Sequence, residues 1–220
     1  MSNLIKNNHI VDDLWTLVTL PAPAEDTVRK QAGKVVIFKV TGEPAATPAQ
    51  LAGAVIPATG HVIVPLTLWN ARKEELASRA ARGKVGIWLE SYELLEDLLA
   101  SFPDINSLPV IAINFPRFVD GRGFSLATHL RTRHQYRNEL RAIGDVLRDQ
   151  LYFMKRCGFD AYALRADRSV EDALASLRDF SEPYQGAVDD ALPVWRRYGR
   201  VSHHAGTAHA IQPSHEDQVD

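Results

Sequence analysis

The chain has only one cysteine, Cys157, among its 220 residues. One cysteine excludes a disulfide within the chain and any zinc or iron-sulfur site built from cysteines alone, and it is typical of a reducing compartment. No apolar run approaches the roughly 20 residues of a membrane-spanning helix, and residues 1–8 lack the apolar core of a secretory signal. We therefore expect a cytoplasmic protein that does not interact with membranes.

Several common cofactor motifs are missing as well. The sequence has no Gly-x-Gly-x-x-Gly after a first strand, no Walker phosphate loop, no Cys-x-x-Cys, no His-Glu-x-x-His and no Gly-x-Ser-x-Gly. Nicotinamide, ATP, zinc and serine-hydrolase chemistry therefore lose their usual support. We expect no cofactor and no metal site.

Apolar residues make up 45% of the chain, enough for one buried core. Five apolar runs alternate with stretches of helical periodicity, and strands joined through helices run parallel. The pattern predicts an α/β fold of consecutive strand-helix units, with a mostly parallel sheet covered by helices. Five units are too few to close an eight-stranded barrel, so we expect an open sheet or a half-barrel. The predicted strands are His61–Leu66, Val85–Leu89, Val110–Phe115, Glu139–Ile143 and Ala161–Leu164.

Polar residues before the helical stretches predict where the helices begin, and glycines predict where some of them end. The predicted N-caps, each with its helix, are Asn70 for 71–81, Ser91 for 92–100, Ser125 for 126–134, Asp145 for 146–157 and Ser169 for 170–180. Gly83 and Gly158 follow two of these helices as stop signals.

The predicted organisation is a single domain over residues 1–197 and a tail. Residues 1–60 form an irregular N-terminal layer that includes short apolar stretches at 10–18 and 35–40 and has room for a hairpin, and residues 61–185 form the strand-helix repeats. A half-barrel would leave an apolar edge that favours a homo-oligomer. Residues 198–220 are expected to be disordered, because the spacing of their four histidines matches no metal motif. Those histidines are His203, His204, His209 and His215.

Positive charge is concentrated in one segment of a chain whose net charge is only −2. Residues 116–158 contain nine Lys or Arg and four Asp or Glu, a local charge of +5 that favours an anionic ligand or an acidic partner. Within it, the glycine-rich loop Pro116–Ser125 follows a predicted strand, where parallel sheets bind ligands. Helix N-terminal amides and an arginine there could hold an oxyanion. The predicted anion site comprises Asp120, Gly121, Arg122, Gly123, Ser125, Arg131 and Arg141.

Simpler interpretations stay open for the same residues. The loop could be a tight turn in which Asp120 binds loop amides and Arg122 is solvated, and Arg141 could pair with Glu139 on its own strand.

Three other residues are candidates for catalysis. Asp145 and Asp149 lie four apart and could divide acid and base roles, although an N-cap and an arginine partner are the simpler roles. Cys157 could be a nucleophile, but the end of a helix favours a small buried residue there.

Several ordered blocks resemble the bacterial family called domain of unknown function 934. They are 115–125, 130–131, 139–150 and 156–160, together with 13–15, 62–66 and 180–185, and the similarity covers about residues 10–184. The chain departs from the family pattern at Arg137-Asn138, where a glycine is expected before Glu139, so a tight turn there is in doubt. Members of the family are commonly encoded beside sulfite reductase, and some are labelled oxidoreductases of sulfite reduction.

The resemblance and the basic loop together suggest an accessory protein of assimilatory sulfate and sulfite reduction, which binds an oxyanion or docks on sulfite reductase. The alternative is an enzyme of oxidoreductase or lyase type that acts on a sulfur-containing or phosphorylated small molecule. Nucleic-acid binding is disfavoured, because the whole chain is slightly acidic and the basic segment lacks interleaved exposed aromatics.

Overall fold

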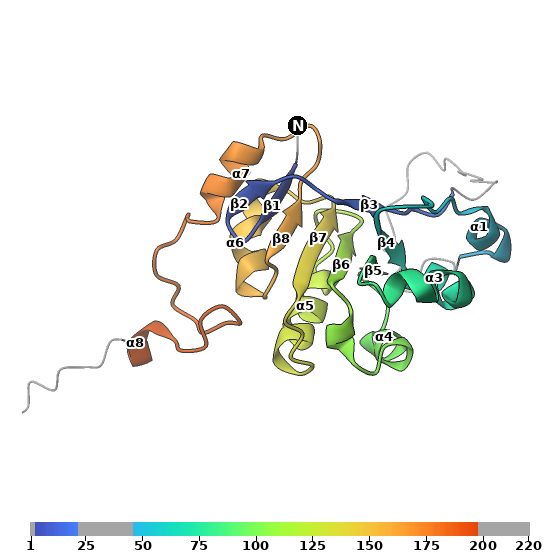
Figure 1. Ribbon diagram of the computed structural model, residues 1–220. Helices are drawn as coiled ribbons and strands as arrows, with labels where there is room; N and C mark the ends of the chain where they lie inside the picture. Colours follow the sequence, from blue (N-terminus) through green and yellow to red (C-terminus); the bar gives the residue numbers. More distant parts are fainter. Residues whose placement is uncertain (1–2, 22–45, 198–220) are drawn as a thin grey trace, which may run out of the picture.

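The computed structural model describes residues 3–21 and 46–197, which form one eight-stranded sheet with helices packed against it (Figure 1). The strand order is β2-β1-β8-β7-β6-β5-β4-β3; neighbours from β3 to β8 are parallel, and β1 is antiparallel to both β2 and β8. The strands are β1 (Leu4–Lys6), β2 (His9–Val11), β3 (Trp15–Leu17), β4 (His61–Pro65), β5 (Val85–Glu90), β6 (Val110–Phe115), β7 (Glu139–Gly144) and β8 (Ala161–Ala163). All five strands predicted from the apolar runs are therefore confirmed.

The helices connect successive parallel strands, except for the last two, which follow β8. They are α1 (Pro48–Gly53), α2 (Leu66–Ala71), α3 (Lys73–Ala80), α4 (Leu95–Ser101), the 3-10 turn η1 (Ile105–Ser107), α5 (Arg122–Thr132), α6 (Arg148–Arg156), α7 (Val170–Ser176) and α8 (Val194–Arg197). Because each strand from β3 to β8 lies beside the preceding one, right-handed crossovers place the connecting helices on one face of the sheet. The main core lies between that face and the helices.

The sheet is curled into a half-barrel, and a short connection shows how far it curls. Seven strand spacings of about 4.8 Å would make a flat sheet about 34 Å wide. The edge strands β2 and β3 are nevertheless joined by only three residues, Asp12–Leu14, whose reach is about 14 Å. The two edges must therefore approach each other. Figure 1 shows this connection, here called the strap, as the blue ribbon running from β2 to β3.

The inner face of the sheet holds a second, smaller apolar cluster made only of strand residues. Its buried members are Ile63, Trp88, Val110, Ala112 and Ile143. Trp88 donates from Nε1 to the carbonyl of Val18, 2.9 Å away, and so reaches the end of β3. The predicted covering by helices is therefore found on one face of the sheet, whereas in the described part of the chain the inner face is covered by the curl of the sheet itself.

Four charged side chains hold the strap against this inner face. Arg141 on β7 is buried and contacts buried Glu139 at 2.6 Å and Asp13 of the strap at 2.8 Å. Lys6 on β1 contacts the second oxygen of Glu139 at 2.7 Å. The pairing of Glu139 with Arg141 that the strand alternation suggested is therefore confirmed, and Asp13 extends it to the strap.

Helix ends agree only in part with the sequence predictions. Ser169 caps α7 by accepting from the amide of Asp172, and Gly158 ends α6 with φ of +103°, as predicted. Gly83 follows α3 with a positive φ of +67°. The four other predicted N-caps are wrong.

Each residue that was wrongly predicted as an N-cap either lies inside a helix or forms a hydrogen bond with a distant residue. Asn70 lies within α2, and Ser125 lies within α5 because that helix already begins after Gly121. The hydroxyl of Ser91 donates to Asp120, and the carboxylate of Asp145 accepts from the amide of Phe118, so neither side chain caps the helix that follows it. Ser91 and Asp145 thus make tertiary hydrogen bonds in place of the local capping bonds that the sequence pattern predicts.

The N-terminal layer contains a hairpin, formed by β1 and β2, which lies largely before the apolar stretch at 10–18. Its turn residues Asn7 and Asn8 have positive φ angles of 50° and 62°, as in the two-residue turns that match strand twist. The apolar stretch at 35–40 and the histidine-containing tail at 198–220 lie outside the described residues. None of the described helices is long and apolar enough to cross a membrane.

Candidate functional site

A polar network joins the carboxyl ends of β5 and β6 at the rim of the sheet where ligands bind in parallel α/β proteins. Buried Ser91 donates from Oγ to Oδ2 of Asp120 at 2.6 Å. Arg122 donates to the same carboxylate from Nε at 2.9 Å and from Nη2 at 2.7 Å, and its guanidinium lies 5.8 Å from the ring of Tyr92. The hydrogen bonds from Arg122 lower the pKa of Asp120 to about 2, so this carboxylate is ionised at neutral pH.

Two further carboxylates lie on the β5 side of this rim. Asn114 at the end of β6 donates from Nδ2 to Oε2 of Glu90 at 2.8 Å, and the amide of Glu90 donates to Oε2 of Glu93 at 2.7 Å. Burial raises the pKa of Glu93, and the negative charges of Glu90 and Asp97 add to this effect. Neither glutamate is among the residues predicted from the sequence, although two acids within four residues of a strand end are a usable signal.

The loop after β6 is tied to the neighbouring β7-α6 unit. The amide of Phe118 donates to Oδ2 of Asp145 at 2.9 Å, and Gln150 of α6 donates from Nε2 to the carbonyl of Phe118 at 3.0 Å. Gly144 has φ of +92° and packs closely against Asn114: a Cβ added at Gly144 would lie 2.4 Å from Oδ1 of Asn114. The loop is therefore held by Asp145 and Gln150 on the β7-α6 side and, through the bond of Ser91 to Asp120, on the β5 side.

Apolar side chains lie exposed along this held loop. Val119 is 72% exposed, Phe118 is also exposed, and Phe153 of α6 is 56% exposed. Gln150, which binds the loop, is three residues before Phe153 on the same helix face, and Phe124 of α5 contacts the Phe153 ring at 5.0 Å. The exposed residues Phe118, Val119 and Phe153 form what we call the rim patch. Exposed Arg117, which makes no ion pair within the described residues, adjoins it.

The structure brings together only part of the predicted anion site. Asp120, Gly121, Arg122, Gly123 and Ser125 all lie at the start of α5.

The other two arginines lie elsewhere. Arg131 is nine residues, or about 13 Å, further along α5, where it contacts Asp160 at 2.8 Å and donates to the carbonyls of Tyr136 and Gly158. Arg141 lies on the inner face of the sheet with Glu139 and Asp13. Neither guanidinium lies with the loop, and each is occupied by acidic or carbonyl partners.

The catalytic candidates also lie apart from one another. Asp145 accepts from the Phe118 amide and contacts Arg165 at 2.9 Å. Asp149 is in the first turn of α6, beside a hollow of about 310 Å³, whereas Cys157 follows the last turn, about 12 Å further along the axis. Burial raises the pKa of the Cys157 thiol, which agrees with a small buried residue and not with a reactive thiolate.

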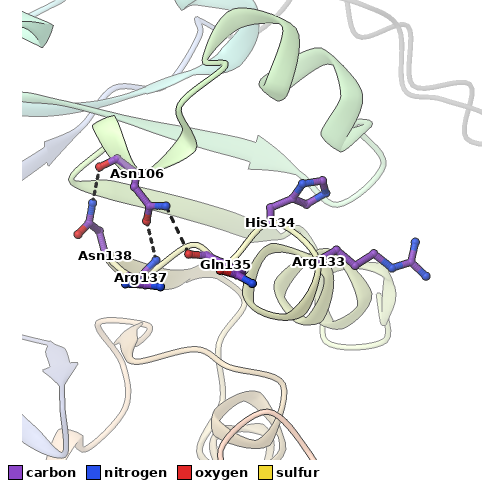
Figure 2. A pocket seen from close by; sticks show the side chains of 6 residues that line it. All are labelled: Asn106, Arg133, His134, Gln135, Arg137 and Asn138. Atoms are coloured by element: carbon purple, nitrogen blue, oxygen red, sulfur yellow. Dashed lines mark hydrogen bonds between the residues drawn. The ribbon is translucent and has the colours of Figure 1, made fainter.

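A basic hollow of about 460 Å³ lies at the opposite end of the sheet, between η1 and the turn before β7 (Figure 2). Asn106 organises this turn: its Nδ2 donates to the Gln135 carbonyl, and its Oδ1 accepts from the Arg137 amide at 2.9 Å. Gln135 has a positive φ of +51°, whereas Arg137 and Asn138, where the family pattern has a glycine, do not, so no glycine-type turn is made at those two residues. Figure 2 shows His134 and Arg133 extending away from Asn106, so these side chains do not converge on one point.

The comparison with protein families decides which group of proteins the chain resembles. A model of bacterial proteins of unknown function, DUF934, matches residues 86–195, which is half of the chain. The chain belongs to the DUF934 family. No curated protein and no solved structure matches it. The matched part runs from β5 to α8, so it contains the rim network and the rim patch, whereas β1 to β4 lie outside it.

Proposed function

We propose that this DUF934 protein is an accessory protein that docks on a partner protein through the rim patch, and that sulfite reductase is the first partner to test. The observation that carries the proposal is an exposed apolar surface on a loop that is held by hydrogen bonds to Asp145 and Gln150 on one side and to Ser91 on the other. Large exposed apolar side chains on a rigid frame are typical of binding surfaces, because little conformational entropy is lost on binding. The choice of sulfite reductase rests on the family resemblance described above.

The polar groups of the rim favour docking over the binding of a small anion. Arg122 already makes two hydrogen bonds to Asp120, so an oxyanion would have to compete with a carboxylate that is ionised at any pH above about 2. Gly121, the N-cap of α5, has no side chain to cap the helix, but Oδ1 of Asp120 accepts from the Arg122 amide at 3.2 Å and the Gly121 carbonyl accepts from the Phe124 amide at 3.3 Å, so few helix amides remain for an anion. The anion would therefore meet one helix end and an arginine whose charge is already compensated.

Titration of sulfite, sulfate and phosphate against thermal stability tests the anion version. A ligand at a hundred times its dissociation constant would stabilise the protein by about 2.7 kcal/mol. The docking proposal expects no such shift. A shift that disappears in Arg122→Ala would instead establish the small-anion function.

Binding of the purified protein to purified sulfite reductase tests the docking version. Val119→Glu and Phe153→Glu each place a charge in the rim patch, and we expect each to weaken binding at least about 10-fold. Val119→Glu is the cleaner of the two, because Phe153→Glu also removes the ring contact with Phe124. Val55→Glu is the matched control, because Val55 is also an exposed valine and lies next to α1, away from the rim. The absence of binding by the unchanged protein would refute this partner, and equal binding by all variants would refute the rim patch.

One observation favours the alternative, in which the protein is an enzyme that acts on a sulfur-containing or phosphorylated small molecule. Glu93 combines a raised pKa with a place at the carboxyl end of a strand, which suits a general acid. Glu93→Gln keeps an oxygen for the Glu90 amide but cannot transfer a proton. If the protein is an enzyme, this variant should fold and yet fail to support growth on sulfate in a strain that lacks the gene. Full growth would exclude this role.

A further inference from the structure

The amino ends of the parallel strands carry an excess of positive charge. Four loops lead into β5, β6, β7 and β8 at this end of the sheet, over residues 81–84, 102–109, 133–138 and 157–160. Their charged residues are four basic and two acidic ones, namely Arg82, Lys84, Arg133, Arg137, Asp104 and Asp160. Asp160 is paired with Arg131 of α5 at 2.8 Å, which leaves Asp104 against the four cations. We call the surface of these loops the basic end.

The cations of the basic end have no acidic partners. All four are exposed, and none forms an ion pair within residues 3–21 and 46–197. Arg82 and Arg133 follow α3 and α5, where a cation offsets the partial negative charge of a helix end. Lys84 directly precedes β5 and Arg137 lies in the turn before β7, so helix ends do not account for these two.

The two hollows described above differ in the same way. The hollow of about 310 Å³ at the carboxyl ends of the strands is lined by two arginines, Arg148 and Arg168, and by three aspartates. The basic hollow of about 460 Å³ is lined by Arg133, His134, Arg137 and three side-chain amides, with no carboxylate. Only the basic hollow therefore presents positive charge that is not balanced locally.

Hydrogen bonds fix the turn that carries Arg137. Asn138 donates from Nδ2 to the carbonyls of Asn106 and Leu108, at 2.8 and 2.9 Å. Arg131 donates from Nη1 to the carbonyl of Asn138 at 2.9 Å. The charges thus lie on a frame that is already ordered, and little conformational entropy of the backbone is lost when a partner binds.

The spread of these charges favours an extended anion over a small one. Figure 2 shows Arg133 and His134 extending away from Asn106, which organises the turn. Side chains that do not converge cannot surround one small anion, but each can meet a different carboxylate along an extended acidic segment.

Two observations favour a polypeptide over a nucleic acid. The side-chain amide of exposed Gln135 makes no hydrogen bond to any residue in the described part of the chain. An amide offers a donor beside an acceptor, which matches a peptide group. Nucleic-acid bases usually stack on exposed aromatic side chains. The aromatic residues of these loops, Phe102, Tyr136 and Phe159, are all buried.

We propose that the basic end binds an acidic segment of a partner polypeptide. Its carboxylates would contact Lys84, Arg133 and Arg137, and its backbone would contact the amide of Gln135. The basic end and the rim patch lie at opposite ends of the strands, so a partner on one surface does not block the other. The proposal does not depend on the partner proposed for the rim patch.

Fluorescence anisotropy of a labelled octaglutamate peptide tests this surface on the full chain, in about 20 mM salt, where screening is weak. Arg133→Glu/Arg137→Glu should weaken binding at least about 10-fold, because attraction becomes repulsion at two positions. Arg148→Glu/Arg168→Glu is the matched control: it changes the net charge by the same amount at the other hollow, and should weaken binding less than about 3-fold. Thermal unfolding checks that each variant is folded.

Several results would overturn the proposal. One is no binding of octaglutamate by the unchanged protein at about 1 mM, and another is an equal loss in both double variants, since the response would then follow net charge alone. Tighter binding of labelled octauridylate, lost in Arg133→Glu/Arg137→Glu, would assign the surface to RNA instead. If that variant does not fold, Lys84→Gln/Arg137→Gln removes two charges without adding repulsion and should weaken binding at least about 3-fold. Unchanged binding there would equally refute the basic end.

Discussion

Replacing Arg141 by methionine should destabilise the protein strongly, because it removes one partner of a buried ion pair. Arg141 and Glu139 are both almost fully buried, and their contact is 2.6 Å. Breaking a buried pair from one side costs about 3–5 kcal/mol, mainly because the other charge stays buried without its partner. Lys6, which is partly exposed, still contacts Glu139, so we expect the lower end of that range, about 3 kcal/mol.

Urea denaturation measures this loss. With a denaturant slope of about 2 kcal/mol per molar, the midpoint should fall by about 1.5 M. The double variant Glu139→Leu/Arg141→Met should recover much of the loss, since a buried pair can be replaced by apolar residues at little cost. Arg168→Met removes an exposed contact to Asp167 of 3.7 Å and should change stability by less than about 0.5 kcal/mol. If Arg141→Met matched this control, the reasoning that the inner face excludes water around the pair would be refuted.

Four further predictions concern the rim and the cysteine. Gly144→Ala should cost at least about 2 kcal/mol in urea denaturation, because φ is +92° and the new Cβ would clash with Asn114. Asp120 has a pKa lowered to about 2, so it stabilises the fold above pH 3.8 and this contribution is lost as pH falls toward 2; Asp120→Asn should flatten acid unfolding in that window. Glu93 has a raised pKa, so its ionisation opposes folding; Glu93→Gln should raise the Tm at neutral pH, and the gain should vanish as pH falls to about 4.5. Alkylation of Cys157 should be slow in native protein and fast in urea, and fast native labelling would contradict its burial.

The strands and their order of connection could be predicted from the sequence because the signal is carried by many residues at once. Runs such as 110–115 are apolar at nearly every position, and no single side chain decides the outcome. The N-caps at Ser91 and Asp145 failed because one polar side chain has several partners available in the folded chain. Ser91 donates to Asp120, and Asp145 accepts from the amide of Phe118; both partners are more than twenty residues away in sequence.

The candidate anion site shows a related limit. A local charge of +5 counts side chains along the chain, but α5 carries Arg122 and Arg131 to opposite ends of the sheet. Strand alternation then turns Arg141 to the inner face, where Asp13 meets it from a position 128 residues away. The three arginines are close in sequence, but their guanidinium groups are far apart in the folded protein. Glu93, whose acidic neighbours are close in sequence, was the rim residue that local inspection could have found.

The antiparallel pairing of β1 with β8 has a consequence for how the chain is completed. Leu4 pairs with Ala163, so β1 waits for a partner that lies 159 residues later in the chain and is synthesised only after the strands between them. Contacts of such separation form late and slowly. During that interval the hairpin of residues 4–11 has no sheet to join, and the charged groups of β7 have neither Lys6 nor Asp13 beside them. Closing of the half-barrel is thus a late event of biosynthesis, in which the two ends of the fold meet.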